Sequence, residues 1–180
     1  MRAVFLDRDG VINKKPPEGE YVISWEGFKF LPRVPEAIRR LNELKILVII
    51  ITNQRGVALG YLTEKKLNEI HQKMLRELKN LGALIDAIYY CPHDKGTCLC
   101  RKPEVGLFLQ AKKDFPEIDF LSSFVVGDSR SDIEAGKKLG CKTILISPGL
   151  KEDDTNNLPS PHFIAADLAE AVEKFIAKII

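Results

Sequence analysis

The sequence predicts an α/β fold in which a parallel β-sheet carries helices on both faces. Short apolar runs that suit buried strands alternate along the chain with segments whose apolar residues recur every three or four positions, and this alternation is typical of such a sheet. The length of 180 residues and a hydrophobic content of 45% suit one globular domain with a proper core. We therefore expect residues 1–180 to form a single domain.

Five apolar runs are predicted to be strands. The first two, residues 3–6 and 46–51, contain no polar residue and are typical of strands buried on both faces of a sheet. The other three runs span residues 84–90, 123–126 and 142–146.

Helices are predicted between these strands. A long helix is expected to begin after Thr63, a good N-cap residue, and to close at Gly82. The other predicted helices span residues 35–44, 105–115, 133–139 and 168–179. Of the connections, residues 14–20 and 147–161 are predicted to be polar loops, and residues 21–30 a small flap or hairpin.

Composition and charge argue against several classes of protein. The net charge of +2 is too small to indicate a nucleic-acid-binding protein. The longest apolar run is too short to span a membrane, and the charged N-terminal segment does not look like a secretory signal. We expect a cytoplasmic protein that binds neither nucleic acid nor membrane, and we expect it to be a monomer.

The stretch around Asp7 and Asp9 is the strongest functional signal in the chain. These two aspartates directly follow the first predicted strand, and in an extended segment their side chains point the same way. Ligands of open α/β sheets bind outside the carboxyl ends of the strands. Two carboxylates held so close favour a cation, and Mg²⁺ prefers oxygen ligands of this kind. The alternative is an ordinary strand that ends in an Asp-Gly turn.

Three other strand ends also carry polar residues. Thr52 and Asn53 follow the second strand, Asp128 and Asp132 follow the fourth, and the segment after the third leads to Lys102. Alone, each has a structural explanation, as a turn residue, a helix cap or a solvated lysine. With the Asp-Gly turn after the first strand, four such explanations would have to hold at one edge of one sheet. We therefore favour a common catalytic site.

A cysteine-rich loop follows the third predicted strand. Cys91, His93, Cys98 and Cys100 offer three thiolates and one imidazole within ten residues, a set that suits a closed, structural Zn²⁺ site. A disulfide is the alternative, which a reducing cytoplasm disfavours. Cys141 is expected to be a small core residue. No role is assigned to His71 or His162.

These motifs resemble those of the haloacid dehalogenase (HAD) superfamily of phosphohydrolases, and more narrowly the branch that holds D,D-heptose 1,7-bisphosphate phosphatase and histidinol-phosphatase. The resemblance covers residues 4–149 and implies a Rossmann-like, HAD-type sheet with a minimal cap and a zinc-stabilised loop. The matching motifs are Asp7-Arg8-Asp9-Gly10, Thr52-Asn53, Lys102-Pro103, Gly127-Asp128 with Asp132, and the cysteine loop.

The resemblance implies Mg²⁺-dependent hydrolysis of a phosphomonoester. Asp7 would be the nucleophile that forms an aspartyl-phosphate, and Asp9 would protonate the leaving alkoxide and later deprotonate water. Mg²⁺ would be held by Asp7, the backbone carbonyl of Asp9 and Asp128. Thr52 and Lys102 would stabilise the transferred phosphoryl group.

The implied substrate is a phosphorylated sugar. We favour removal of the 7-phosphate from D-glycero-D-manno-heptose 1,7-bisphosphate, a step toward ADP-heptose for lipopolysaccharide core or S-layer glycan. A second phosphate requires cations, and the residues predicted to bind substrate are Lys14, Lys15, Asn53, Gln54, Arg55 and Arg101. Related heptose enzymes often have serine where Arg55 stands and a basic residue where Ser129 stands, which leaves the sugar open.

Other functions remain as alternatives. Histidinol phosphate carries an ammonium group that Glu18 and Glu20 would suit. A nucleic acid 3′-phosphatase would require a basic groove, and a phosphotransferase would pass the phosphoryl group to an alcohol. A non-enzymatic zinc module would explain the cysteine loop but not the aspartates.

Overall fold

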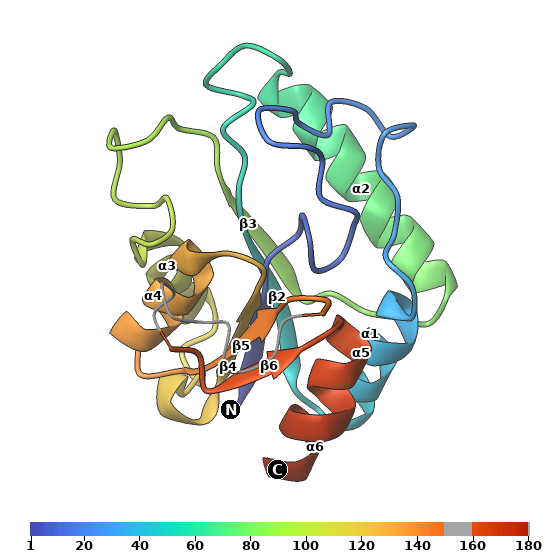
Figure 1. The fold of residues 1–180 in the computed structure, drawn as a ribbon, viewed down its shortest axis with the longest axis vertical. Coiled ribbons are helices and arrows are strands. Elements are labelled where there is room, and N and C mark those ends of the chain that lie inside the picture. The colour runs from blue at the N-terminus through green and yellow to red at the C-terminus, as the bar shows by residue number, and fades with distance from the viewer. Residues whose placement is uncertain (150–159, 180) are drawn as a thin grey trace.

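The computed structural model describes residues 1–149 and 160–179, and within them six parallel strands form one sheet (Figure 1). The order across the sheet is β3-β2-β1-β4-β5-β6, and every neighbouring pair is parallel. The predicted parallel α/β fold is therefore confirmed. The strands are β1 (Ala3–Leu6), β2 (Leu47–Asn53), β3 (Ala87–Cys91), β4 (Phe124–Gly127), β5 (Lys142–Ile146) and β6 (Phe163–Ala165).

Helices cover both faces of this sheet. Figure 1 shows α1 and α2 with the C-terminal helical segment on one side of the strands, and α3 and α4 on the other. The main helices are α1 (Val34–Glu43), α2 (Glu64–Asn80), α3 (Gly106–Asp114) and α4 (Arg130–Lys138), and a short 3₁₀ turn, η1 (Phe120–Ser122), precedes β4. The C-terminal segment comprises α5 (Leu168–Glu170), the π-helical η3 (Ala171–Ile176) and α6 (Ala177–Ile179).

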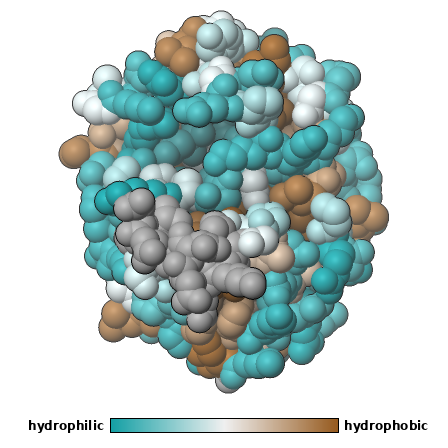
Figure 2. Space-filling model, in the orientation of Figure 1, coloured by the Kyte–Doolittle hydropathy of each residue, from teal (hydrophilic) through white to brown (hydrophobic). Residues whose placement is uncertain are grey.

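Alternation along β1 divides the core into two layers. Val4 and Leu6 belong to the apolar cluster under α1 and α2, whereas Ala3 and Phe5 belong to the cluster under α3 and α4. All four side chains are buried because both faces of a central parallel strand are covered. On the face shown in Figure 2, hydrophobic residues appear as separate spots in a largely hydrophilic surface. The apolar residues thus serve mainly to fix the sheet, whose carboxyl edge carries the polar residues.

Several boundaries differ from the prediction for local reasons. Helix α4 begins at Arg130, three residues early, because Ser129 and Asp132 form a capping box. The third strand begins at Ala87 and extends to Cys91. Strand β6 was not predicted, because three residues are too few to produce a recognisable pattern.

Residues 21–30 form no hairpin. The segment is held instead by aromatic packing, with Trp25 stacked on Phe28 and Phe30 edge-on to Phe28 at ring-centroid distances of 5.1 Å in both cases. An isolated bridge between Asn13 and Phe30 closes the loop at its base. Aromatic residues of this segment therefore pack against one another as a cluster and do not pair as β-strands.

Other predictions are confirmed. The Thr63 hydroxyl accepts a hydrogen bond from the Lys66 backbone N–H, as an N-cap does, and Cys141 is buried in the core. Most of the predicted polar loop 147–161 lies outside the described residues. Within the described part of the chain, none of the helices combines the length and the apolar character that crossing a membrane requires.

Candidate active site and metal centres

The carboxyl ends of the strands open into a cavity of about 770 Å³. The strand order reverses direction between β1 and β4, and this switch point is where open α/β sheets bind ligands. Asp7 and Asp9 follow β1, Asp128 follows β4, and all three line the cavity. The rest of the rim comes from the loop of residues 15–21, from the end of β2, from the cysteine loop, and from Ser129 and Ser131 after β4.

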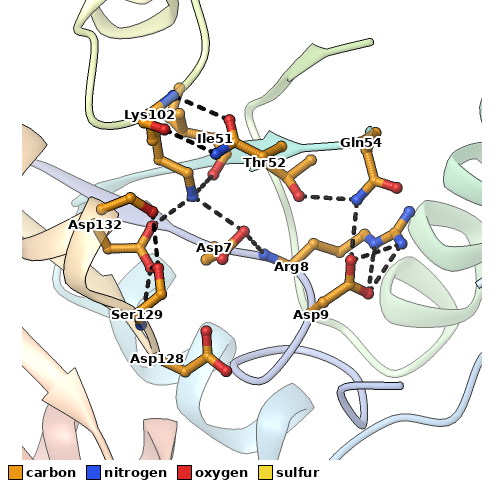
Figure 3. Close-up of polar contacts among 12 residues, drawn as sticks. Asp7, Arg8, Asp9, Ile51, Thr52, Gln54, Lys102, Asp128, Ser129 and Asp132 are labelled. Atoms are coloured by element: carbon orange, nitrogen blue, oxygen red, sulfur yellow. Dashed lines mark hydrogen bonds and ion pairs between the residues drawn. The ribbon is translucent and has the colours of Figure 1, made fainter. Parts of the chain in front are cut away.

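Lys102 lies beside Asp7, between two carboxylates (Figure 3). Its ammonium nitrogen is 3.1 Å from Asp7 Oδ1 and 2.6 Å from Asp132 Oδ1, and it donates to the Ile51 carbonyl at 2.6 Å. The side chain is almost fully buried. Burial alone would lower the pKa of Lys102, but the charges of Asp132 and Asp7 raise it above its usual value. The lysine is therefore a fixed positive charge beside Asp7.

Asp7 lies in an environment that disfavours its negative charge. Burial raises the pKa of Asp7 to about 7; Lys102 opposes this shift, while the charges of Asp132, Asp9 and Asp128 add to it. Any further positive charge placed beside Asp7 would stabilise its ionised form.

Asp9 is held by several donors at once. Arg8 donates from Nη2 to both carboxylate oxygens at 2.9 and 3.0 Å, and Gln54 donates to Oδ2 at 3.0 Å (Figure 3). Asn13 also donates, to Oδ1 at 2.8 Å. Burial would raise the pKa of Asp9, but the Arg8 charge and these hydrogen bonds outweigh it and hold the pKa below its usual value. The orientation of this carboxylate is thus set by its neighbours.

The donor set near Asp7 fits Mg²⁺. Carboxylate oxygens of Asp7, Asp128 and Asp132 lie within 4.8 Å of one another. Asp128 approaches the β1 loop closely because Gly10 has no side chain; a Cβ there would lie 2.1 Å from Asp128 Oδ2. Asp132 is buried against Lys102, whereas Asp7 and Asp128 line the cavity, where a metal ion could reach them.

Thr52, Asn53 and Gln54 adopt distinct positions at the end of β2. The buried Thr52 hydroxyl accepts from Gln54 Nε2 at 3.0 Å. Asn53 brackets the backbone of Lys102: its amide donates to the Lys102 carbonyl at 3.1 Å and accepts from the Lys102 N–H at 3.0 Å. Asn53 lines the cavity, whereas Gln54 is buried and directs its amide to Asp9 and Thr52.

The cysteine loop brings its four predicted ligands together. The Sγ atoms of Cys91, Cys98 and Cys100 lie 3.2 to 3.5 Å apart, and His93 Nδ1 is 3.2 Å from Cys100 Sγ and 3.6 Å from Cys91 Sγ. Sulfurs at the corners of a zinc tetrahedron would be about 3.8 Å apart. The sulfurs are not bonded to one another, and the four ligand atoms lie within 4.8 Å of one another, as a Zn²⁺ site requires.

The predicted cationic residues do not all reach the cavity. Lys15, Arg55 and Arg101 line it together with Lys95, which was not predicted. Lys14 is exposed and is not among the lining residues. Arg55 is paired with Asp94 of the cysteine loop at 2.5 Å.

Two buried polar groups have partners that no local pattern indicates. Asp132 belongs to the predicted set of strand-end carboxylates, but its ion pair is with Lys102, 30 residues earlier in the sequence. His71 lies four residues after Leu67 and so falls on the apolar face of α2, a signal of burial that was available. Its nearest polar partner is Arg8, 63 residues earlier in the sequence, and no local pattern indicates that pairing.

Comparison with known proteins gives consistent matches. Residues 99–171 match the HAD-hydrolase-like family model. The chain is 44% identical over 146 residues to the D-glycero-beta-D-manno-heptose-1,7-bisphosphate 7-phosphatase of Rhodopseudomonas palustris, covering 77% of this chain and 79% of the relative. It is 40% identical over 154 residues to the alpha-anomer 7-phosphatase of Campylobacter jejuni, covering 85% and 87%.

A solved structure matches nearly the full length of the chain. The D,D-heptose 1,7-bisphosphate phosphatase of B. bronchiseptica, crystallised with magnesium and phosphate, superposes with a TM-score of 0.88 at 34% identity and 99% coverage of both chains. The fold, the clustered carboxylates and these similarities lead to one conclusion: the chain is a HAD-like phosphatase and belongs to the family of the D-glycero-D-manno-heptose-1,7-bisphosphate 7-phosphatases.

Proposed function

We propose that this phosphatase removes the 7-phosphate of D-glycero-D-manno-heptose 1,7-bisphosphate through an aspartyl-phosphate on Asp7, in the synthesis of ADP-heptose. The observation that carries the mechanism is the position of Asp7, which lines the cavity with Lys102 only 3.1 Å away. A nucleophilic carboxylate beside a buried cation suits attack on an anionic phosphoryl group.

In the first step, Asp7 forms a bond to phosphorus while the bond from phosphorus to the sugar oxygen breaks. Asp9 gives a proton to that departing oxygen. In the second step, Asp9 takes a proton from water, the water oxygen bonds to phosphorus, and the Asp7 carboxylate is released with inorganic phosphate. Lys102 and the Thr52 hydroxyl stabilise the charge on the phosphoryl oxygens.

Asp7, Asp128 and the backbone carbonyl of Asp9 are the residues that would hold Mg²⁺. The ion supplies positive charge that offsets the repulsion between the Asp7 carboxylate and the phosphate. Asp132 has a different role in this proposal, since it pairs with Lys102 and keeps that ammonium in place.

Cys91, His93, Cys98 and Cys100 would hold a structural Zn²⁺. The last of these ligands is followed directly by Arg101 and Lys102, so an ordered loop presents both cations to the site. Asn53 completes this arrangement by binding the Lys102 backbone from the sheet side.

The rim favours a substrate with a second phosphate. Four basic side chains line the cavity, those of Lys15, Arg55, Lys95 and Arg101, and a distal phosphate would bind among them. The relatives include enzymes named for the alpha and for the beta anomer, so the anomer is left to experiment. Glu18 and Glu20 also line the cavity, which keeps histidinol phosphate as the second candidate.

The test is phosphate release in the presence of Mg²⁺ from a panel of esters. The panel holds both anomers of the heptose bisphosphate, histidinol phosphate, a sugar monophosphate and a 3′-phosphorylated oligonucleotide, with the Asp7→Asn variant as the blank. We expect one heptose bisphosphate to be hydrolysed most efficiently. Preference for histidinol phosphate would overturn the proposed substrate. Phosphate release by Asp7→Asn equal to that of the wild type would overturn the proposed mechanism.

A further inference from the structure

We infer that His71 is a positioning residue for this reaction: it orients Arg8, and through Arg8 it fixes the Asp9 carboxylate. The inference rests on the proposed function, because it gives His71 a consequence only if Asp9 acts on the leaving group and on water. It assigns a role to a buried polar contact between helix α2 and the loop after β1.

Arg8 is among the largest fully buried side chains of the described structure, with no exposed surface. A buried guanidinium is costly unless its donors are paired. Nε and Nη2 are taken by Asp9, and Nη1 lies 3.1 Å from His71 Nε2. The Phe28 ring lies 5.9 Å from the guanidinium carbon and helps to enclose it.

This contact defines the state of His71. A guanidinium has donors only, so the Nε2 atom of His71 must be the acceptor. The imidazole is therefore neutral and carries its proton on Nδ1. Burial and the Arg8 charge act in the same direction, since both lower the pKa of His71.

The geometry explains why Asp9 needs such support. Its carboxylate reaches the cavity but is held from behind by Arg8, which touches both oxygens. If Nη1 lost its acceptor, the guanidinium would rotate toward another one and the two-oxygen contact would weaken. A displacement of about 1 Å at a catalytic group lowers rates by about 100-fold in known cases.

The experiment compares three variants under the conditions that give the best wild-type turnover. His71→Leu removes the acceptor, His71→Gln offers an amide oxygen in its place, and Met74→Ala empties a core position of the same helix without removing a polar group. We expect His71→Leu to lower kcat by about 10- to 100-fold with KM changed much less. His71→Gln should recover most of the loss, and folded Met74→Ala should keep wild-type kcat.

A measurement independent of activity tests the same contact. Two-bond ¹H–¹⁵N spectra should show His71 as the Nδ1–H tautomer at neutral pH, and a protonated Nε2 would overturn the inference. Wild-type kcat in His71→Leu, no recovery in His71→Gln, or an equal loss in Met74→Ala would also overturn it. Absence of phosphate release by the wild type from every ester would instead overturn the proposed function, and the inference with it.

Discussion

The ammonium of Lys15 lies 2.7 Å from Asp128 Oδ2, and this ion pair joins the loop of residues 15–21 to the end of β4. Burial raises the pKa of Asp128, and Lys15 opposes that shift. Lys15 is therefore paired with a carboxylate that we propose as a Mg²⁺ ligand, and we expect the two cations to compete for it.

This competition predicts the effect of Lys15→Met. The variant should need less Mg²⁺ for half-maximal activity, by up to about fivefold, because a partly exposed ion pair contributes about 1 kcal/mol or less. The measurement is a Mg²⁺ titration of phosphate release. Lys14→Met is the matched control, since the neighbouring lysine does not line the cavity. An unchanged or higher Mg²⁺ requirement in Lys15→Met would contradict the competition.

Asp132→Asn should lower both stability and kcat. It removes one of the two carboxylates paired with the buried Lys102, and breaking a buried ion pair costs about 3 to 5 kcal/mol. The free energy of unfolding from urea titrations measures the first effect and steady-state kinetics the second. Glu134→Gln, on the same helix and paired only with exposed Arg130 in the described structure, should change stability by about 0.5 kcal/mol or less. Equal stabilities of the two variants would refute the assigned role of Asp132.

Removal of zinc should lower activity by about tenfold or more, because the loop that presents Lys102 loses its order. Elemental analysis should find one Zn²⁺ per chain, and activity lost to a chelator should return with Zn²⁺ but not with Mg²⁺ alone. Cys98→Ser should lose the metal, whereas Cys141→Ser, in the core, should keep it. Full turnover of a zinc-free preparation would show that the metal does not support the site.

Arg101→Ala should raise KM for a bisphosphate more than Arg55→Ala does. Arg101 Nη1 is buried without a hydrogen-bond partner among the described residues, whereas Arg55 is already paired with Asp94. Since a hydrogen bond to a charged group contributes about 1.5 to 3 kcal/mol, the expected increase for Arg101→Ala is about 10- to 100-fold. A sugar monophosphate, which has no second phosphate, is the control substrate. The reverse order of the two KM values would assign the distal phosphate to Arg55.

Stability should depend on pH through His71. Its folded-state pKa is lowered to about 3 from 6.5, mainly by burial and then by the Arg8 charge. The unfolded chain thus takes up a proton as pH falls through 6.5, while the folded chain does not until about 3. The contribution of His71 to the free energy of unfolding is therefore complete above pH 7. It falls by about 2 kcal/mol between pH 7.5 and 5. Urea unfolding of wild type and His71→Gln at both values isolates this contribution; identical pH dependence would exclude it.

Those parts of the fold and of the site that depend on local sequence patterns could be predicted from the sequence. Asp7, Asp128 and the cysteine loop carry their chemistry at fixed spacings after apolar runs, so their meeting at one sheet edge follows from parallel topology. The pairing of His71 with Arg8 and of Arg55 with Asp94 depends on how α2 and the cysteine loop pack, which no local spacing records. The aromatic packing of residues 21–30 was missed for the same reason.

The division between sheet and loops also bears on how such an enzyme can diverge. Asp7 and Asp128 belong to strand ends that are fixed by the core, whereas Lys15, Lys95 and Arg101 belong to connections outside the sheet. After gene duplication, mutations in those connections would alter which ester is accepted while the reaction stays the same. Ancestral or chimeric proteins with exchanged rims are therefore expected to differ in preferred ester and to share their dependence on Asp7.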